Sequence, residues 1–195
     1  TPLSMLMLVA GLLALSVGFL IMRRACNAAG KYLALTEFAV AEWSLVYVFE
    51  SASKTVALRQ FWSQLAYVGT LAAPPLFLLF ALAYSQHTRW ISRRNVMLLI
   101  TPLVIIFALA CTNSWHHLIW TGIDIEPNTL IARYHHGPAF WGLVAYGYIL
   151  LLASLGLLYD ATRRFPRFYS LRTIALLAGG ALPLIGNVMY VSDIN

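Results

Sequence analysis

The chain has 195 residues, of which 61% are hydrophobic and only 10% are charged, with a formal net charge of +6. Soluble domains carry about 25% charged residues, so this composition excludes an ordinary soluble protein and indicates an integral membrane protein. The positive charge does not indicate a nucleic-acid partner, because most lysines and arginines cluster in short turns between apolar segments, as expected for anchoring at a membrane surface.

Six segments are apolar enough to form membrane-spanning helices, which need roughly 20 residues to cross a hydrocarbon core of about 30 Å. They lie at residues 3–22, 32–51, 61–84, 96–111, 138–159 and 171–191. Helices are expected because backbone polar groups in lipid must be paired within the segment. We therefore expect one domain over residues 1–195, an all-α membrane protein folded as a polytopic helical bundle.

The basic residues predict the orientation of these helices. Ten of the 13 lysines and arginines fall in the first, third and fifth loops. Because positive residues mark the cytoplasmic side, we expect the N-terminus and the long fourth loop, residues 112–137, to be external. The chain begins with threonine and stops just after an apolar run. We therefore expect a fragment of a longer protein, in which a seventh helix after Asn195 returns the chain to the cytoplasm.

The second predicted helix contains three glutamates, and carboxylates within a membrane are costly enough to need partners. At 1.5 Å per residue, Glu42 lies about 15 Å into the membrane, whereas Glu50 reaches the outer interface. Glu50 either forms an interfacial ion pair with Lys54 or belongs to a ligand site. Glu42 either helps to bind a ligand, or changes protonation between states, or is a neutral carboxyl that only fixes helix packing.

The external segment contains four of the five histidines: His116, His117, His135 and His136. Imidazoles with Asp124 and Glu126 nearby are suitable ligands for zinc or copper. However, adjacent histidines point in different directions and no HxxxH, HExxH or CxxC motif is present, so we expect no metal site. Histidines confined to helix ends and loops also argue against haem, and we expect no cofactor. We expect these residues to form an interfacial belt and a folded external cap.

No nucleophile accompanied by a base, phosphate-binding glycine loop or dinucleotide motif is present, so no catalytic residue is predicted. Cys26 and Cys111 are expected on opposite sides of the membrane and cannot pair.

Several motifs occur in a characteristic order: MRRAC, AEWSLVYVFE, CTNSWHHLIW, HHGPAFW and LPLIGNVMY. Together they resemble the N-terminal seven-helix sensor region of bacterial membrane histidine kinases, over essentially the whole chain. The matching positions are Thr112, Asn113, His116, His117, Leu118, Trp43, Glu50, Pro183 and Asn187. The resemblance implies an inner-membrane input module whose seventh helix leads into cytoplasmic PAS, kinase or cyclic-dinucleotide synthase domains. It also implies a homodimer, with any kinase activity in the cytoplasmic part.

The sequence therefore favours a sensor that binds an unidentified small molecule or responds to the lipid bilayer. The predicted ligand-binding residues are Trp43, Glu42, Glu50, Asn113, His116, His117 and Asn187. Five of them are expected to line one polar pocket that opens outward: Trp43, Glu50, Asn113, His117 and Asn187. Two alternatives stay open. One is a non-catalytic accessory subunit of a larger membrane complex, and the other is a transporter.

Overall fold

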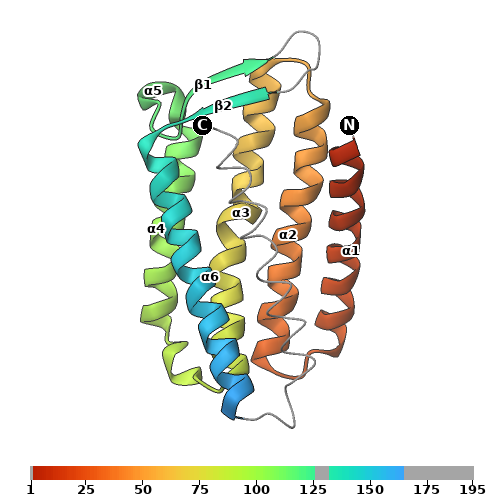
Figure 1. Ribbon diagram of the computed structural model, residues 1–195, viewed down its shortest axis with the longest axis vertical. Coiled ribbons are helices and arrows are strands. Elements are labelled where there is room, and N and C mark those ends of the chain that lie inside the picture. The colour runs from red at the N-terminus through yellow and green to blue at the C-terminus, as the bar shows by residue number, and fades with distance from the viewer. Residues whose placement is uncertain (1, 126–131, 165–195) are drawn as a thin grey trace.

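The computed structural model describes residues 2–125 and 132–164, which form a bundle of long helices with a small hairpin at one end (Figure 1). The long helices are α1 (Pro2–Arg24), α2 (Ala28–Ala52), α3 (Val56–Tyr84), α4 (Arg93–Cys111) and α6 (Pro138–Arg164). The short elements are η1 (Thr88–Trp90), α5 (Asn113–His116), β1 (Trp120–Ile125) and β2 (Ala132–His136). In this part of the chain, five helices are long and apolar enough to cross a membrane. The predicted all-α helical bundle is confirmed, and the predicted helix at 171–191 lies outside the described residues.

Side-chain caps determine where three of the helices begin. The Asn27 side chain accepts a hydrogen bond from the backbone N–H of Gly30 at the start of α2. Thr55 caps α3 and Ser92 caps α4 in the same way. Such caps satisfy backbone donors that have no partner within the helix. As a result, α2 and α3 start several residues before the apolar runs from which they were predicted.

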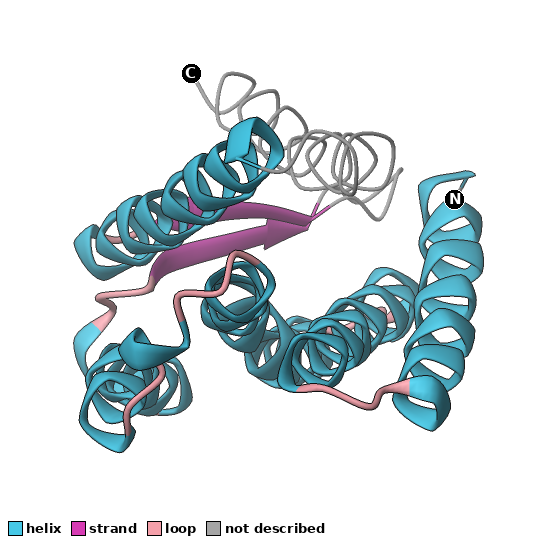
Figure 2. Ribbon diagram, turned by 90° about the horizontal axis from the view of Figure 1, so that it is seen from below, coloured by secondary structure: helices cyan, strands magenta, loops and turns pink. Residues whose placement is uncertain are grey.

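Helix α3 is the centre of the bundle, in contact with α2, α4 and α6, while α1 packs against α2 at the edge (Figure 2). Half of the most apolar stretch of α3 is buried, compared with 17% for α1 and 6% for α4. In a membrane, the exposed apolar faces of α1 and α4 are therefore the surfaces available to lipid. Close packing of α1 on α2 depends on Gly11 and Gly18, which face Leu45 and Phe38.

The two ends of the bundle differ in charge. We call the end that carries the α1–α2 turn, η1 and the end of α6 the basic end. Its basic residues in the described part are Arg23, Arg24, Lys31, Arg89, Arg93, Arg94, Arg163 and Arg164. The opposite end, which carries the α2–α3 turn, α5 and the two strands, we call the hairpin end (Figure 1). Its basic residues in the same part are Lys54, Arg59 and Arg133.

The segment predicted as a polar cap contains an antiparallel hairpin. Strands β1 and β2 pair with Ile123 opposite Tyr134, and the register is irregular between Trp120 and Gly122. The backbone N–H of Gly137 donates to the Ile119 carbonyl and so closes the hairpin onto the start of α6. The hairpin therefore spans from the end of α4 to the beginning of α6.

Candidate functional site

A buried polar cluster, formed by Glu50, Arg59, Ser63 and Tyr134, connects the hairpin to the helices beneath it. The Tyr134 hydroxyl on β2 donates to Glu50 Oε1, near the end of α2. The same hydroxyl lies 2.8 Å from Ser63 Oγ on α3. Arg59 and Ser63 are only 3% and 6% exposed. One tyrosine oxygen thus joins β2, α2 and α3.

Arg59 stabilises the same region. Its Nε donates to the backbone carbonyl of Ser53 over 2.9 Å, which holds the α2–α3 turn against the start of α3. The guanidinium is also close enough to Glu50 and Tyr134 for its positive charge to act on both. A buried arginine is tolerated when a carboxylate and acceptor groups surround it. Arg59 therefore holds the α2–α3 turn through Ser53 and lies within electrostatic range of Glu50.

The Tyr134 hydroxyl is a stable proton donor. Burial raises its pKa above the ordinary value, and the charge and hydrogen bond of Glu50 raise it further. Helix α2 ends at Ala52, before Lys54, so the helical Glu50–Lys54 pair allowed by the sequence does not form. Tyr134 is instead the hydrogen-bond donor to the Glu50 carboxyl.

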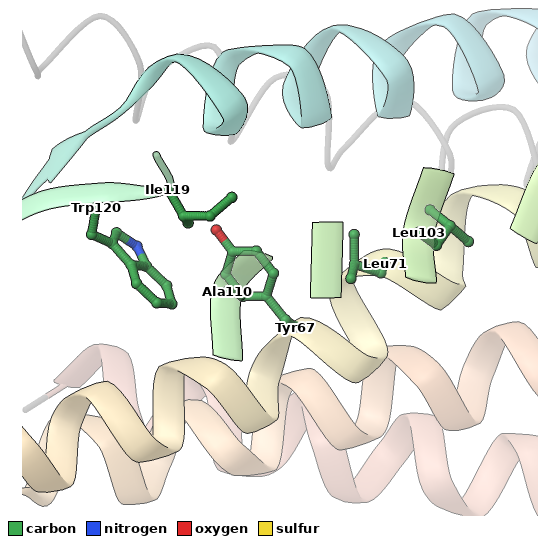
Figure 3. Packing of buried hydrophobic residues seen from close by; sticks show 6 residues of the cluster. All are labelled: Tyr67, Leu71, Leu103, Ala110, Ile119 and Trp120. Carbon is green, nitrogen blue, oxygen red and sulfur yellow. The ribbon is translucent and has the colours of Figure 1, made fainter. Parts of the chain in front are cut away.

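An apolar layer beneath the hairpin extends the core of the bundle. Trp120 on β1 is 4% exposed and meets Tyr67 on α3 edge to face, with ring centroids 5.3 Å apart. Ile119, Ala110, Leu71 and Leu103 complete this cluster (Figure 3). The ring of Trp120 also lies 6.3 Å from that of Tyr134. The hairpin is therefore seated on α3 and α4 by apolar burial as well as by the polar cluster.

Asn113 fixes the turn that leads into β1. Its Oδ1 accepts hydrogen bonds from the backbone N–H groups of Ile119 and Trp120, at 2.9 and 3.1 Å. Its Nδ2 donates to the Trp120 carbonyl at 2.8 Å, and the residue is 4% exposed. Both ends of the Asn113 amide are therefore bonded to the backbone of the same segment.

The other predicted site residues lie at different depths. His117 is exposed in a left-handed turn, while the His116 ring accepts from the Leu118 N–H and lies 3.1 Å from Thr112 Oγ1. Trp43 is 39% exposed on α2, about 10 Å along the helix from Glu50. Asn187 lies outside the described residues. The structure thus groups Glu50, Asn113 and the two histidines at the hairpin end and places Trp43 farther along the bundle.

Glu42 lies between α2 and α3. Its Oε2 accepts a hydrogen bond of 2.8 Å from the backbone N–H of Gly69. Its Oε1 is buried and has no hydrogen-bond partner among the residues that the structure describes. Gly69 has no side chain, so its backbone can approach this carboxyl closely. Glu42 therefore belongs to the α2–α3 contact and not to the cluster at the hairpin end.

Two histidines on β2 differ in environment. His135 is exposed and lies 2.9 Å from Asp124 on β1. His136 stacks on Phe140 with ring centroids 3.6 Å apart. Burial, reinforced by the neighbouring His135, lowers the pKa of His136 to about 4. The His136 imidazole is therefore neutral at physiological pH.

Sequence reasoning missed three members of the polar cluster: Arg59, Ser63 and Tyr134. Arg59 carried a usable signal, since it is an isolated basic residue on the side of the bundle that has few of them. Ser63 and Tyr134 are ordinary residue types, separated from their partners by 71 and 84 positions along the chain. Nothing in the local sequence marks them.

Within residues 2–125 and 132–164, five apolar helices of spanning length, with a hairpin folded over one end, define a multi-pass helical membrane protein. The family model described as the N-terminal 7TM region of histidine kinase matches residues 6–195. The chain belongs to this family, which confirms the resemblance seen in its motifs. No curated protein and no solved structure matches the chain significantly.

Proposed function

We propose that the chain is the signal-input module of a membrane histidine kinase. A signal received at the hairpin end changes the packing of α2 and α3, and this change is passed to a cytoplasmic output domain of the same polypeptide. The family supplies the histidine kinase context. The observation that carries the proposal is the buried polar cluster, in which a strand of the hairpin shares one hydroxyl with two membrane helices. By resemblance, the working unit is a homodimer.

In this proposal the hairpin has two arrangements, one seated on the polar cluster and one lifted away from it. With the hairpin seated, Tyr134 satisfies Glu50 and Ser63, and Arg59 holds the α2–α3 turn. Lifting the hairpin removes the Tyr134 hydroxyl from two buried groups, which must then move to find new partners. A small molecule that replaces the hydrogen-bond partners of Glu50 or Asn113 favours the lifted arrangement. A small molecule that binds the exposed His117 more tightly when the hairpin is lifted has the same effect. The signal therefore acts by differential binding to the two arrangements.

We further propose that the hairpin end is external and that the protein lies in the inner membrane of a bacterium. The support is the excess of arginine and lysine at the basic end, which the positive-inside tendency assigns to the cytoplasm.

Labelling of intact cells tests this orientation. The starting variant lacks Cys26 and Cys111, since both are exposed. In this background, Asp124→Cys is expected to react with a membrane-impermeant maleimide. The control, Thr88→Cys in η1 at the basic end, is expected to react only after the membrane is permeabilised. The reverse pattern would exclude an external hairpin.

The signalling role is tested with Tyr134→Phe in the full-length protein, reconstituted in membrane vesicles. The substitution removes only the hydroxyl, and each hydrogen bond lost, at about 1 kcal/mol, corresponds to roughly a fivefold shift toward the lifted arrangement. We expect faster hydrogen exchange in residues 120–125 and 132–136 and at least about a fivefold change in autophosphorylation. The matched control is Tyr146→Phe, which removes a hydroxyl that donates to the Leu99 carbonyl between α6 and α4. Equal autophosphorylation in both variants, despite faster exchange in the first, would contradict the proposal.

A further inference from the structure

A groove lies at the basic end, between the end of α1 and the start of α2. It has a volume of about 420 Å³ and is lined by Leu20, Ile21, Arg24, Ala25, Cys26, Asn27 and Gly30. Gly30 has no side chain, which lets it approach Ala25 closely, since a Cβ there would lie 3.0 Å from that of Ala25. The groove is remote from the polar cluster, at the opposite end of the bundle.

The groove spans the boundary between the hydrocarbon core and the polar surface. Arg24 is the last residue of the apolar span Leu3–Arg24 and so lies at the level of the lipid headgroups. Leu20 is about one helical turn deeper and is 58% exposed on the surface of the bundle. One part of the groove therefore faces lipid chains and the other faces headgroups.

The polar part of the groove carries a positive charge, Arg24, that has no partner within residues 2–125 and 132–164. The Arg24 side chain is exposed and makes no hydrogen bond or ion pair with any residue that the structure describes. In the same part of the chain, the basic end contains one ion pair, between Arg164 and Asp160. An anion in the groove would consequently meet a positive potential with little competition from carboxylates.

We propose that this groove binds one anionic phospholipid, with its phosphate at Arg24 and an acyl chain along Leu20 and Ile21. A soluble anion would satisfy the arginine but leave the apolar wall empty. A zwitterionic lipid would cover the wall but bring no net charge. An anionic phospholipid supplies both parts in one molecule, as at other basic pockets between membrane helices. Bound there, it ties the end of α1 to the start of α2.

The test uses the full-length protein, delipidated in a neutral detergent, and follows its thermal unfolding during lipid titration. Phosphatidylglycerol is expected to raise the Tm in a saturable manner. Phosphatidylcholine with the same chains is expected to bind at least about tenfold more weakly, and inorganic phosphate to cause no shift. Arg24→Gln is expected to weaken phosphatidylglycerol binding about fivefold. The matched control is Arg93→Gln, which removes an exposed charge at the same end but outside the groove, and it is expected to weaken binding less than about twofold.

Three results would overturn the proposal. They are equal stabilisation by phosphatidylcholine, stabilisation by phosphate alone, and equal weakening by the two arginine substitutions. If Arg24→Gln fails to fold, lipid adducts are counted by native mass spectrometry on the wild type and on Arg93→Gln in equal mixtures of phosphatidylglycerol and phosphatidylcholine. One phosphatidylglycerol retained in preference to phosphatidylcholine by both proteins supports the groove, while equal retention of the two lipids excludes it.

Discussion

Replacement of Gly69 with alanine is expected to lower the free energy of unfolding by about 3 kcal/mol, at the upper end of the usual cost of overpacking a well-packed core. A Cβ at this position would overlap the Ala39 carbonyl oxygen and Glu42 Oε2, and would come within 2.9 Å of the Trp43 nitrogen. Two of these atoms belong to the α2 backbone and cannot turn aside as a flexible side chain can. The two helices must therefore separate, which also weakens the hydrogen bond from the Gly69 N–H to Glu42.

Unfolding of Gly69→Ala is measured by titration with a denaturing detergent in mixed micelles, followed by circular dichroism. The matched controls are Gly142→Ala and Gly156→Ala in α6, where an added Cβ meets nothing within 4 Å. Alanine favours a helix over glycine by up to about 1 kcal/mol, so both controls are expected to be neutral or slightly stabilising. If Gly69→Ala has the same free energy of unfolding as these controls, α2 and α3 do not approach closely at this position.

Asn113→Ala is expected to unfold the turn that leads into β1, at a cost of about 3 kcal/mol. The substitution leaves the N–H groups of Ile119 and Trp120 and the Trp120 carbonyl without their side-chain partner. Ile119 and Trp120 are buried, and an unsatisfied buried group costs about 1 to 3 kcal/mol. The hairpin then loses its packing against α3, while helices α1, α2, α3, α4 and α6 are expected to stay folded.

Hydrogen exchange resolved by mass spectrometry measures this effect, with residues 119–125 expected to lose protection and α3 to keep it. The matched control is Asn95→Ala, which removes one side-chain bond to the Trp90 carbonyl at the exposed basic end. That loss is expected to cost less than about 1 kcal/mol, because water can replace an exposed partner. Unchanged protection of residues 119–125 in Asn113→Ala would show that the amide does not hold the turn.

Most of the bundle could be predicted because its signals are local. An apolar run of about 20 residues forms a helix in lipid whatever surrounds it, since its backbone groups have no other partners. Glu50 and Asn113 were recognisable as special because each is a polar residue in an unusual setting. The hairpin was not predicted, because WTGIDI and ARYHH are short and their pairing depends on contact with Tyr67 and Ala110 beneath them.

The contacts within the candidate site could not be predicted from local sequence. Sequence reasoning offered Lys54, a neighbour along the chain, as one of two possible partners for Glu50, whereas α2 ends before Lys54 and the carboxyl meets Tyr134. Glu42 was expected to need a partner, and the sequence did not indicate that this partner is the backbone N–H of Gly69. Contacts of this kind depend on which helices pack together and at what distance, and a single sequence contains no direct record of either.

The sequence by itself determined that the chain is a multi-pass helical membrane protein, that it belongs to the N-terminal 7TM regions of histidine kinases, and that its charge is concentrated at one end. These properties depend on composition, motif order and the length of apolar runs, each of which is read along the chain. Only the tertiary structure decided that Tyr134 joins the hairpin to α2 and α3 and that Gly69 sets the distance between those helices. Both depend on atoms far apart in sequence, brought together by apolar burial that has no preference for particular polar partners.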